Sequence, residues 1–182
     1  MITTVLSGIL LFCVLLLAVV VLAPLFYGAP WHPTSTKKII EILKFCDAQP
    51  GEKIYDPGSG DGRVLIIAAQ RFGLNGVGVE IDPLKTWVSR ILIRYKGLTQ
   101  KIKIFRQSMY GFDFSGADIL YLYLTHQAID RLMEDIKGQL KPGVKIICYR
   151  FCLRNITPEK VNTDKTIFLY RLNKGREVDR YS

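Results

Sequence analysis

A glycine-rich loop, Asp-Pro-Gly-Ser-Gly-Asp-Gly over residues 56–62, lies between a short strand pattern and an apolar helix pattern. Glycine allows a tight turn and lets another molecule approach the backbone closely. A strand that runs through such a loop into a helix is typical of doubly wound α/β sheets, in which ligands bind beyond the carboxyl ends of the strands. The loop therefore constrains both the fold class and the position of a binding site.

Strand and helix patterns alternate after this loop as well. Strands are predicted at residues 53–56, 76–80, 101–106, 119–124 and 144–149. Helices are predicted at residues 39–46, 64–72, 84–95 and 129–136. This order predicts an α/β fold with a doubly wound, mostly parallel sheet that has helices on both faces.

Two local patterns refine this prediction. Asp82 and Pro83 are a typical N-cap and first residue of a helix, and the apolar residues of that helix recur on one face. These residues are Leu84, Trp87, Val88, Ile91 and Tyr95. Residues 166–172 and 176–181 flank Asn-Lys-Gly, which predicts a C-terminal antiparallel hairpin.

The amino-terminal segment carries no Lys, Arg, Asp or Glu before Lys37, and residues 5–23 are almost continuously apolar. A helix of that length reaches roughly 28 Å, close to the ~30 Å of a bilayer core. We expect one uncleaved transmembrane anchor at residues 1–23, a Pro/aromatic connector at 24–36 and a catalytic domain at 37–182. Because the first charges, Lys37 and Lys38, are basic, the positive-inside rule predicts a single-pass membrane protein with a cytoplasmic catalytic domain.

Two alternatives exist for the amino-terminal segment. A cleaved signal peptide would need a basic start and a small-residue cleavage site, whereas the chain begins Met-Ile-Thr-Thr and shows no clear site of that kind. A buried core helix would need a protein layer around it, and no other part of the chain has the pattern of such a layer.

The charges of the loop indicate its ligand. The phosphate-binding sequence G-x-x-x-x-G-K-[ST] is absent, and the third glycine comes one residue too early for G-x-G-x-x-G. Asp56 and Asp61 would repel a pyrophosphate, but they can stabilise the sulfonium and ammonium groups of S-adenosylmethionine. Glu80, at the end of the second predicted strand, can accept hydrogen bonds from ribose hydroxyls. The alternative for Glu80 is a solvated acid at the end of a strand.

At this point the chain resembles class I S-adenosylmethionine-dependent methyltransferases, from about residue 53 to its end. The resemblance is carried by Y-D-P-G-S-G-D-G-R at 55–63, V-E-I-D-P at 79–83 and L-K-P-G at 140–143. Residues 28–35, 87–90 and 117–124, together with the apolar start, resemble the family of the ATP synthase c-subunit lysine methyltransferase and its small prokaryotic relatives. Two positions depart from the common pattern: Pro57 replaces a Leu or Val, and Ser108 replaces an acid that contacts adenine.

The resemblance implies a Rossmann-like fold, S-adenosylmethionine as cofactor and lysine methylation as activity. It implies a cofactor site formed by Asp56, Gly58, Ser59, Gly60, Asp61, Gly62, Glu80, Ile81 and Ser108. It also implies that Pro33, Thr34 and Ser35 belong to the substrate region.

Candidate catalytic residues end or follow the fourth predicted strand: Tyr121, Tyr123 and Thr125. Strand alternation places both tyrosines on the same side of the sheet, where aromatic rings could hold an ammonium group. The alternative is that both rings belong to the core. We interpret His126 as the start of a helix and not as a base, and we predict no metal site.

The expected partners are a lipid bilayer and a protein substrate in or near it. The same fold could instead methylate a lipid or a lipophilic small molecule. The net charge of +9 also allows an RNA-binding protein or RNA methyltransferase, but the basic residues show no RNA-module signature, so nucleic acid is not favoured. A scaffold that has lost cofactor binding is a further alternative, against which the intact loop and Glu80 argue.

Overall fold

The computed structural model describes residues 5–12, 14–15, 33–136, 138–154 and 156–172. The chain divides into two compact units, Met1–Pro33 and Thr34–Ser182. In the first unit, residues 5–12 and 14–15 are helical. None of the helices in the described ranges combines the length and apolar character needed to cross a membrane. Most of the predicted anchor and connector, residues 1–4, 13 and 16–32, lies outside the described residues, so these boundaries stay predictions.

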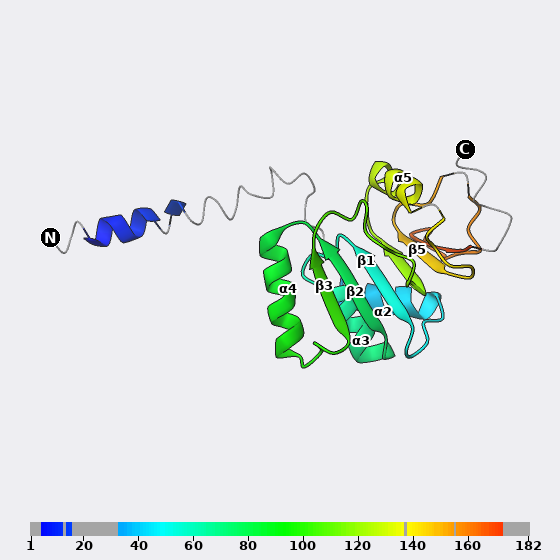
Figure 1. The fold of residues 1–182 in the computed structure, drawn as a ribbon, viewed down its shortest axis with the longest axis horizontal. Helices are drawn as coiled ribbons and strands as arrows, with labels where there is room; N and C mark the ends of the chain where they lie inside the picture. Colours follow the sequence, from blue (N-terminus) through cyan, green and yellow to red (C-terminus); the bar gives the residue numbers. More distant parts are fainter. Residues whose placement is uncertain (1–4, 13, 16–32, 137, 155, 173–182) are drawn as a thin grey trace. The chain divides into compact units, whose positions relative to one another are not determined.

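The second unit is built on one sheet whose described strands run in the order β3-β2-β1-β4-β5-β7-β6 (Figure 1). The strands are β1 (Lys53–Pro57), β2 (Asn75–Glu80), β3 (Ile102–Arg106), β4 (Ile119–Leu122), β5 (Lys145–Tyr149), β6 (Lys160–Val161) and β7 (Ile167–Arg171). The first five are parallel, while β7 is antiparallel to both β5 and β6. The predicted doubly wound, mostly parallel sheet is confirmed.

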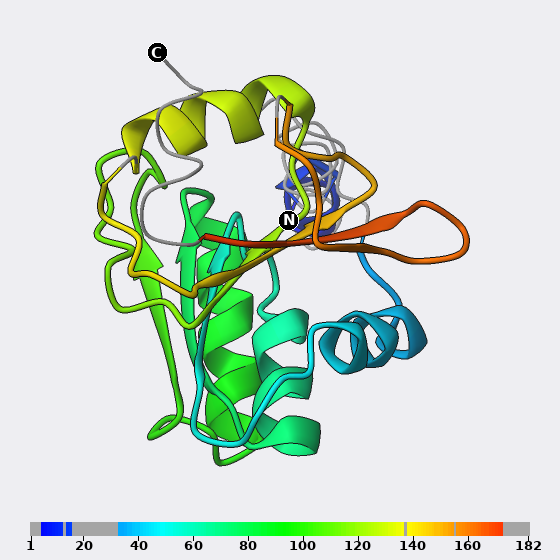
Figure 2. The same cartoon turned by 90° about the vertical axis from the view of Figure 1, so that its right-hand side faces the viewer.

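Helices cover both faces of the sheet, as Figure 2 shows from the side. They are α2 (Thr36–Phe45), α3 (Arg63–Phe72), α4 (Pro83–Tyr95) and α5 (His126–Asp135). Helices α2, α3 and α4 pack on one face and α5 packs on the other. Their starts follow the local sequence: Ser35, Asp82 and Thr125 accept backbone N–H groups at the N-caps of α2, α4 and α5.

The two cores meet at β4, where successive side chains point to opposite faces. Tyr121 is buried with α2 and α3, and Tyr123 packs against that same core. Leu120 and Leu122 are buried with α5, and Leu124 packs against them. The predicted alternation along this strand is therefore confirmed.

The carboxyl-terminal hairpin differs from the prediction. It is formed by β6 and β7, and the Asn162 side chain accepts the N–H groups of Thr166 and Ile167, both at 2.8 Å, in the turn between them. β7 has β5 on one side and β6 on the other. The sequence did not predict β6, because a strand of two residues leaves almost no periodic signal. The other segment of the predicted hairpin, residues 176–181, lies outside the described residues.

Helix α4 packs with its less apolar face inward. Its buried residues are Thr86, Ser89 and Ile93, whereas most of the predicted apolar stripe is exposed. The small side chain of Ser89 allows close packing: a Cβ atom added to Gly62 would lie 3.2 Å from the Ser89 Cβ. A leucine or tryptophan facing inward would separate the helix from the glycine-rich loop.

Gly78 in β2 lies where the sheet, α3 and the glycine-rich loop meet most closely. A Cβ atom there would lie 2.6 Å from both Ile104 Cδ1 and Ser59 Oγ and 2.9 Å from Leu65 Cδ1. We expect Gly78→Ala to lower the free energy of unfolding by about 1–3 kcal/mol, the range for an overpacked core, measured by denaturant unfolding. Gly76→Ala, in the same strand with a nearest contact of 3.1 Å, should cost less; equal costs would contradict this explanation.

Candidate active site

The glycine-rich loop is fixed to the neighbouring strand by backbone hydrogen bonds. The N–H groups of Gly58 and Ser59 both donate to the carbonyl of Val79, at 2.7 and 3.1 Å. Gly58, Gly60 and Gly62 have φ values of 80°, 56° and 75°, in the left-handed region that glycine adopts without strain. The loop therefore lies at the carboxyl ends of β1 and β2, where the sequence predicted the site.

Glu80 connects this loop to the start of α4. One carboxylate oxygen accepts the N–H of Gly60 at 2.8 Å, and the other accepts the N–H of Asp82 at 2.9 Å. The side chain is only 7% exposed, so Glu80 is not a solvated strand-end acid. A carboxylate has about four acceptor sites, and capacity remains for two hydroxyl donors.

The two aspartates of the loop are in different environments. Asp56 is buried, and its pKa is raised well above the usual value by burial and by the nearby charges of Glu80 and Asp61. Asp61 is half-buried and accepts the Arg63 guanidinium in a bidentate ion pair, with a shortest N–O distance of 2.5 Å. Arg63 was missed by the sequence analysis, although its place two residues after Asp61 allows this pair.

Neighbouring side chains leave little space around the loop backbone. A Cβ atom at Gly58 would lie 3.3 Å from Leu124 Cδ2, and the one at Gly62 would lie against Ser89 of α4. The buried Ser59 hydroxyl has no hydrogen-bond partner among the described residues. Because a Cβ atom at Gly78 would lie 2.6 Å from it, this hydroxyl belongs to the packing between the loop and β2.

This set of groups fits S-adenosylmethionine better than a phosphate compound. The carboxylate of Glu80 can accept from a diol, and the acidic group of Glu80, Asp56 and Asp61, with only one basic partner in Arg63, favours a cationic ligand over an anionic one. Backbone N–H groups of the loop and the start of α3 can hold the carboxylate of the cofactor. A pyrophosphate at the same place would meet three acidic side chains.

Tyr121, near the carboxyl end of β4, contacts the segment before α2. Its hydroxyl lies 3.2 Å from the Thr34 hydroxyl, and both side chains are buried. Burial raises the pKa of Tyr121, the hydrogen bond with Thr34 lowers it, and the charge of Asp56 raises it further. The ring belongs to the core, as the alternative interpretation expected. Its hydroxyl group connects Thr34 to the carboxyl end of β4.

Tyr123 forms an aromatic pair that the sequence analysis did not predict. Its ring centroid lies 4.9 Å from that of Tyr149, at the end of the adjacent strand β5. The Arg150 guanidinium lies over both rings, at 5.9 Å from Tyr123 and 5.6 Å from Tyr149. The strand order β1-β4-β5 could have suggested this pair, because parallel neighbours end at one edge.

The other predicted site residues are placed as follows. Thr125 caps α5 by accepting the N–H of Ala128 at 3.4 Å, and Ser35 caps α2 by accepting the N–H of Lys38 at 3.3 Å. Ile81 is exposed directly after β2, and the Ser108 hydroxyl, beyond the end of β3, accepts the N–H of Tyr110 at 3.1 Å. Pro33, the last residue of the first unit, is exposed. Functional roles for these residues stay predictions.

His126 begins α5, as expected, and its ring packs edge-on against Phe151 with centroids 5.0 Å apart. Within the described ranges, no three His, Cys, Asp or Glu side chains gather in a way that could hold a metal ion.

Comparison with known proteins gives a family match. The family profile described as "ANTKMT methyltransferase domain" matches residues 56–160. This range begins at Asp56, the first residue of the glycine-rich loop, and ends in β6, so it includes Glu80, Tyr123 and Tyr149.

Two curated relatives are similar to the chain over most of its length. A protein-lysine N-methyltransferase from Saccharolobus islandicus is 28% identical, and the match covers 81% of this chain and 96% of that protein. The human ATP synthase c-subunit lysine N-methyltransferase is also 28% identical, over 81% of this chain and 64% of that protein.

A solved structure has a similar fold. The Salinibacter ruber protein described as an RNA methyltransferase in complex with S-adenosyl-L-homocysteine superposes with a TM-score of 0.76 and 27% identity. The match covers 80% of this chain and 96% of that chain. Its ligand is the product that S-adenosylmethionine leaves after methyl transfer.

Glu80 provides the first test of the site. In Glu80→Gln, one of the two carboxylate oxygens becomes an NH₂ donor that faces a backbone N–H. We expect the affinity for S-adenosylhomocysteine, measured by calorimetry, to fall about tenfold or more, since hydrogen bonds to a charged group are worth ~1.5–3 kcal/mol. Glu134→Gln, on the exposed side of α5, is the control; an unchanged affinity in Glu80→Gln would contradict the proposed role.

Asp56 provides a test that depends on pH. Because its folded pKa is raised above the unfolded value of 3.8, the wild type loses stability as the pH rises from about 4 toward the folded pKa, by at most ~1.4 kcal/mol per pH unit. The Asp56→Asn variant has no titratable group at this position, so it does not lose stability with rising pH for this reason. The melting temperature of the variant minus that of the wild type should therefore increase with pH over this window and then level off.

Asp118→Asn is the control, because the pKa of Asp118 is shifted in the opposite direction and its effect on stability should depend on pH in the opposite way. Burial raises the pKa of Asp118, but hydrogen bonds from Lys141 and the Lys53 N–H outweigh this effect, so the pKa is lowered. The stabilisation from Asp118 is present above pH 3.8 and is lost as the pH falls through the folded pKa. Asp118→Asn should lower the melting temperature at neutral pH; a pH-independent difference for Asp56→Asn would refute the burial argument.

Proposed function

We infer that this chain, which belongs to the ANTKMT methyltransferase family, methylates a lysine side chain of a protein in or beside a membrane. The chain is an S-adenosylmethionine-dependent methyltransferase. Both curated relatives described above carry lysine methyltransferase in their names. The observation that carries the choice of acceptor is the pair of Tyr123 and Tyr149 with a cation over it.

The cofactor, when bound, supplies a methyl group on a positively charged sulfur. The residues that would hold it are Glu80, through its remaining acceptor capacity, and the amides of the glycine-rich loop. The main tasks left to the protein are to align the acceptor and to exclude water.

A lysine acceptor must lose its proton before it can accept a methyl group, and its ordinary pKa is near 10.4. Burial against apolar surface lowers that pKa, so a strong general base is not required. The aromatic pair can hold the ammonium form, as it holds the Arg150 guanidinium. We propose that the incoming lysine takes the place of that guanidinium over Tyr123.

Thr34 and Tyr121 support this arrangement from the side of α2. Their hydrogen bond joins residues 87 apart in the sequence and fixes the segment before α2 against the end of β4. We propose that Tyr121 is a positioning residue, because its hydroxyl is buried and already has a partner. Thr125, on the exposed rim beyond β4, is proposed to contact the acceptor.

The membrane part of the proposal rests on the charge-free amino-terminal residues 1–36. We propose that residues 1–23 anchor the protein in the bilayer and that the catalytic domain lies on the cytoplasmic side, where the positive-inside rule places Lys37 and Lys38. An enzyme in the same membrane as its target has a raised effective concentration of that target.

The function is tested with membranes from cells that lack this gene. Purified full-length enzyme and labelled S-adenosylmethionine are added, and protein is separated from the lipid extract. We expect label in the protein fraction, on lysine by mass spectrometry, and no label with Gly58→Arg, in which the added side chain fills the loop. Label only in the lipid extract would assign the enzyme to lipid or lipophilic small-molecule methylation.

Tyr123 tests the acceptor site in the same assay. Tyr123→Leu removes the aromatic face, so we expect the initial rate of lysine methylation to fall about 2- to 30-fold, the factor for a cation–π interaction of ~0.5–2 kcal/mol. Tyr123→Phe retains the face and should keep most of the rate. If both variants lose the rate equally, the phenol hydroxyl and not the ring is the important group.

RNA is the second candidate acceptor, because the Salinibacter ruber protein is described as an RNA methyltransferase and this chain has a net charge of +9. Addition of total RNA to the assay distinguishes the two. Label in RNA but not in protein would replace the lysine proposal.

A further inference from the structure

The outward face of α4 is an apolar stripe that nothing in the described part of the second unit covers. Leu84, Trp87, Ile91 and Tyr95 are 50%, 62%, 46% and 85% exposed. Their spacing of three, four and four residues places them on one side of the helix. Surface helices normally bury such a stripe, and an exposed one marks an interaction site.

The chain around this stripe is strongly basic. From Pro83 to Phe112 it contains no Asp or Glu. It contains seven basic residues, Lys85, Arg90, Arg94, Lys96, Lys101, Lys103 and Arg106. Within the described residues, Lys85 pairs with Asp82 at 3.6 Å, while Arg94 and Lys96 are exposed and have no ion-pair partner. Four of these basic residues, Lys85, Arg90, Arg94 and Lys96, belong to α4 or its C-cap and therefore lie on the same helix as the stripe.

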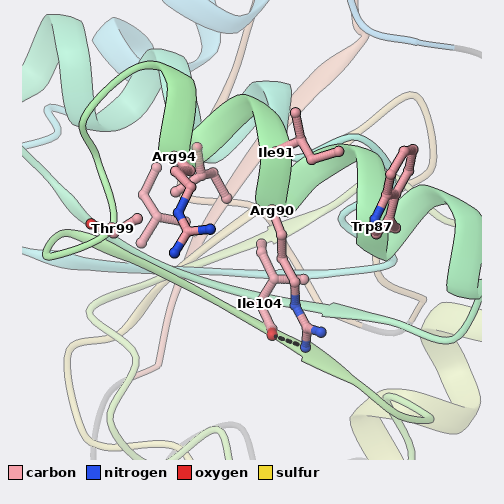
Figure 3. Close-up of a pocket in the computed structure, with 8 residues that line it drawn as sticks. Trp87, Arg90, Ile91, Arg94, Thr99 and Ile104 are labelled. Atoms are coloured by element: carbon pink, nitrogen blue, oxygen red, sulfur yellow. Dashed lines mark hydrogen bonds between the residues drawn. The ribbon is translucent and has the colours of Figure 1, made fainter.

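A groove of about 430 Å³ continues the stripe toward the sheet (Figure 3). Trp87, Arg90, Ile91 and Arg94 form its α4 side, and Ile104 of β3 lies across from them. The Arg90 guanidinium donates to the Ile104 carbonyl at 2.8 Å, which covers part of the edge strand. The surface thus combines an aromatic ring, aliphatic side chains and guanidinium groups within one helix and its neighbouring strand.

We propose that this α4 surface binds the surface of an anionic lipid bilayer. The apolar stripe enters the boundary between headgroups and acyl chains, with Trp87 and Tyr95 at the level that aromatic rings prefer, and the basic residues contact lipid phosphates. This surface belongs to the second unit and uses none of residues 1–36. It goes beyond the proposed function, because it requires neither the anchor nor the lysine acceptor.

The chemistry of the surface selects lipid over other occupants. RNA could pair with the basic residues and stack on Trp87, but Leu84 and Ile91 can neither stack on bases nor donate hydrogen bonds. A second copy of the same face would bring together two sets of the like charges that α4 and its C-cap carry, Lys85, Arg90, Arg94 and Lys96. An anionic bilayer satisfies both the charges and the aliphatic side chains.

The experiment uses the full chain with Trp31→Phe, which leaves Trp87 as the single tryptophan of the two in the sequence. The protein is reconstituted into nanodiscs of phosphatidylcholine, with or without phosphatidylglycerol. We expect Trp87 emission to shift to shorter wavelength in the anionic nanodiscs and to be quenched by lipids that are brominated near the headgroup. In neutral nanodiscs both effects should be smaller.

Two charge reversals provide a matched comparison. Arg94 and Arg71 are both exposed arginines in the last turn of a helix, in α4 and α3 respectively, so reversal has a similar helix-dipole cost. Arg94→Glu should reduce the ratio of lipid-contacting to solvent-exposed Trp87 at least about fivefold, the factor for one lost basic contact. Arg71→Glu should leave it unchanged, and both variants should keep their affinity for S-adenosylhomocysteine, which shows that they are folded.

Three results would overturn the proposal. One is Trp87 emission that is the same in both kinds of nanodisc and insensitive to the brominated lipid. Another is an equal effect of Arg71→Glu and Arg94→Glu. The third is a Trp87 response to added RNA without any response to lipid, which would assign the surface to nucleic acid. Because the readout is fluorescence and not methyl transfer, each result is independent of the acceptor.

Discussion

The Glu80 carboxylate is the interaction on which the geometry of the site depends. It accepts the N–H of Gly60 from the glycine-rich loop and the N–H of Asp82 from the start of α4. One buried side chain thereby holds the loop after β1 and the helix after β2 in a fixed relation. In the proposed mode of cofactor binding the same oxygens would also accept hydrogen bonds from the cofactor, so one carboxylate would both organise the site and bind the ligand.

The distribution of negative charge explains why the site suits a cationic cofactor. Three carboxyl groups lie close together in different environments. Glu80 accepts hydrogen bonds from backbone amides, Asp61 forms an ion pair with Arg63, and Asp56 is buried and has a raised pKa. The ion pair of Asp61 and the raised pKa of Asp56 reduce the repulsion between the three carboxyl groups in the folded protein. The acidic character that remains favours a sulfonium and disfavours a phosphate.

Helix α4 shows how one element can serve two surfaces. Its small inward residues allow the helix to approach the glycine-rich loop, since Gly62 and Ser89 are almost in contact. As a result the large apolar residues of the helix point outward and are surrounded by basic residues. Close packing against the glycine-rich loop and an exposed apolar stripe therefore both follow from which face of α4 points inward.

The parts of the molecule that depend on local periodicity and local chemistry could be predicted from the amino-acid sequence. These are the alternation of strands and helices, the glycine-rich loop, the Asp82 cap and the place of Glu80 at the end of β2. Contacts between distant residues, such as Thr34 with Tyr121 or Tyr123 with Tyr149, could not be predicted in this way, because they depend on strand order and register. The pairing of β7 with β6 could not be predicted either, because a two-residue strand leaves almost no periodic signal. Tertiary packing also set the inward face of α4, because the short distance between the helix and Gly62 admits only small side chains there.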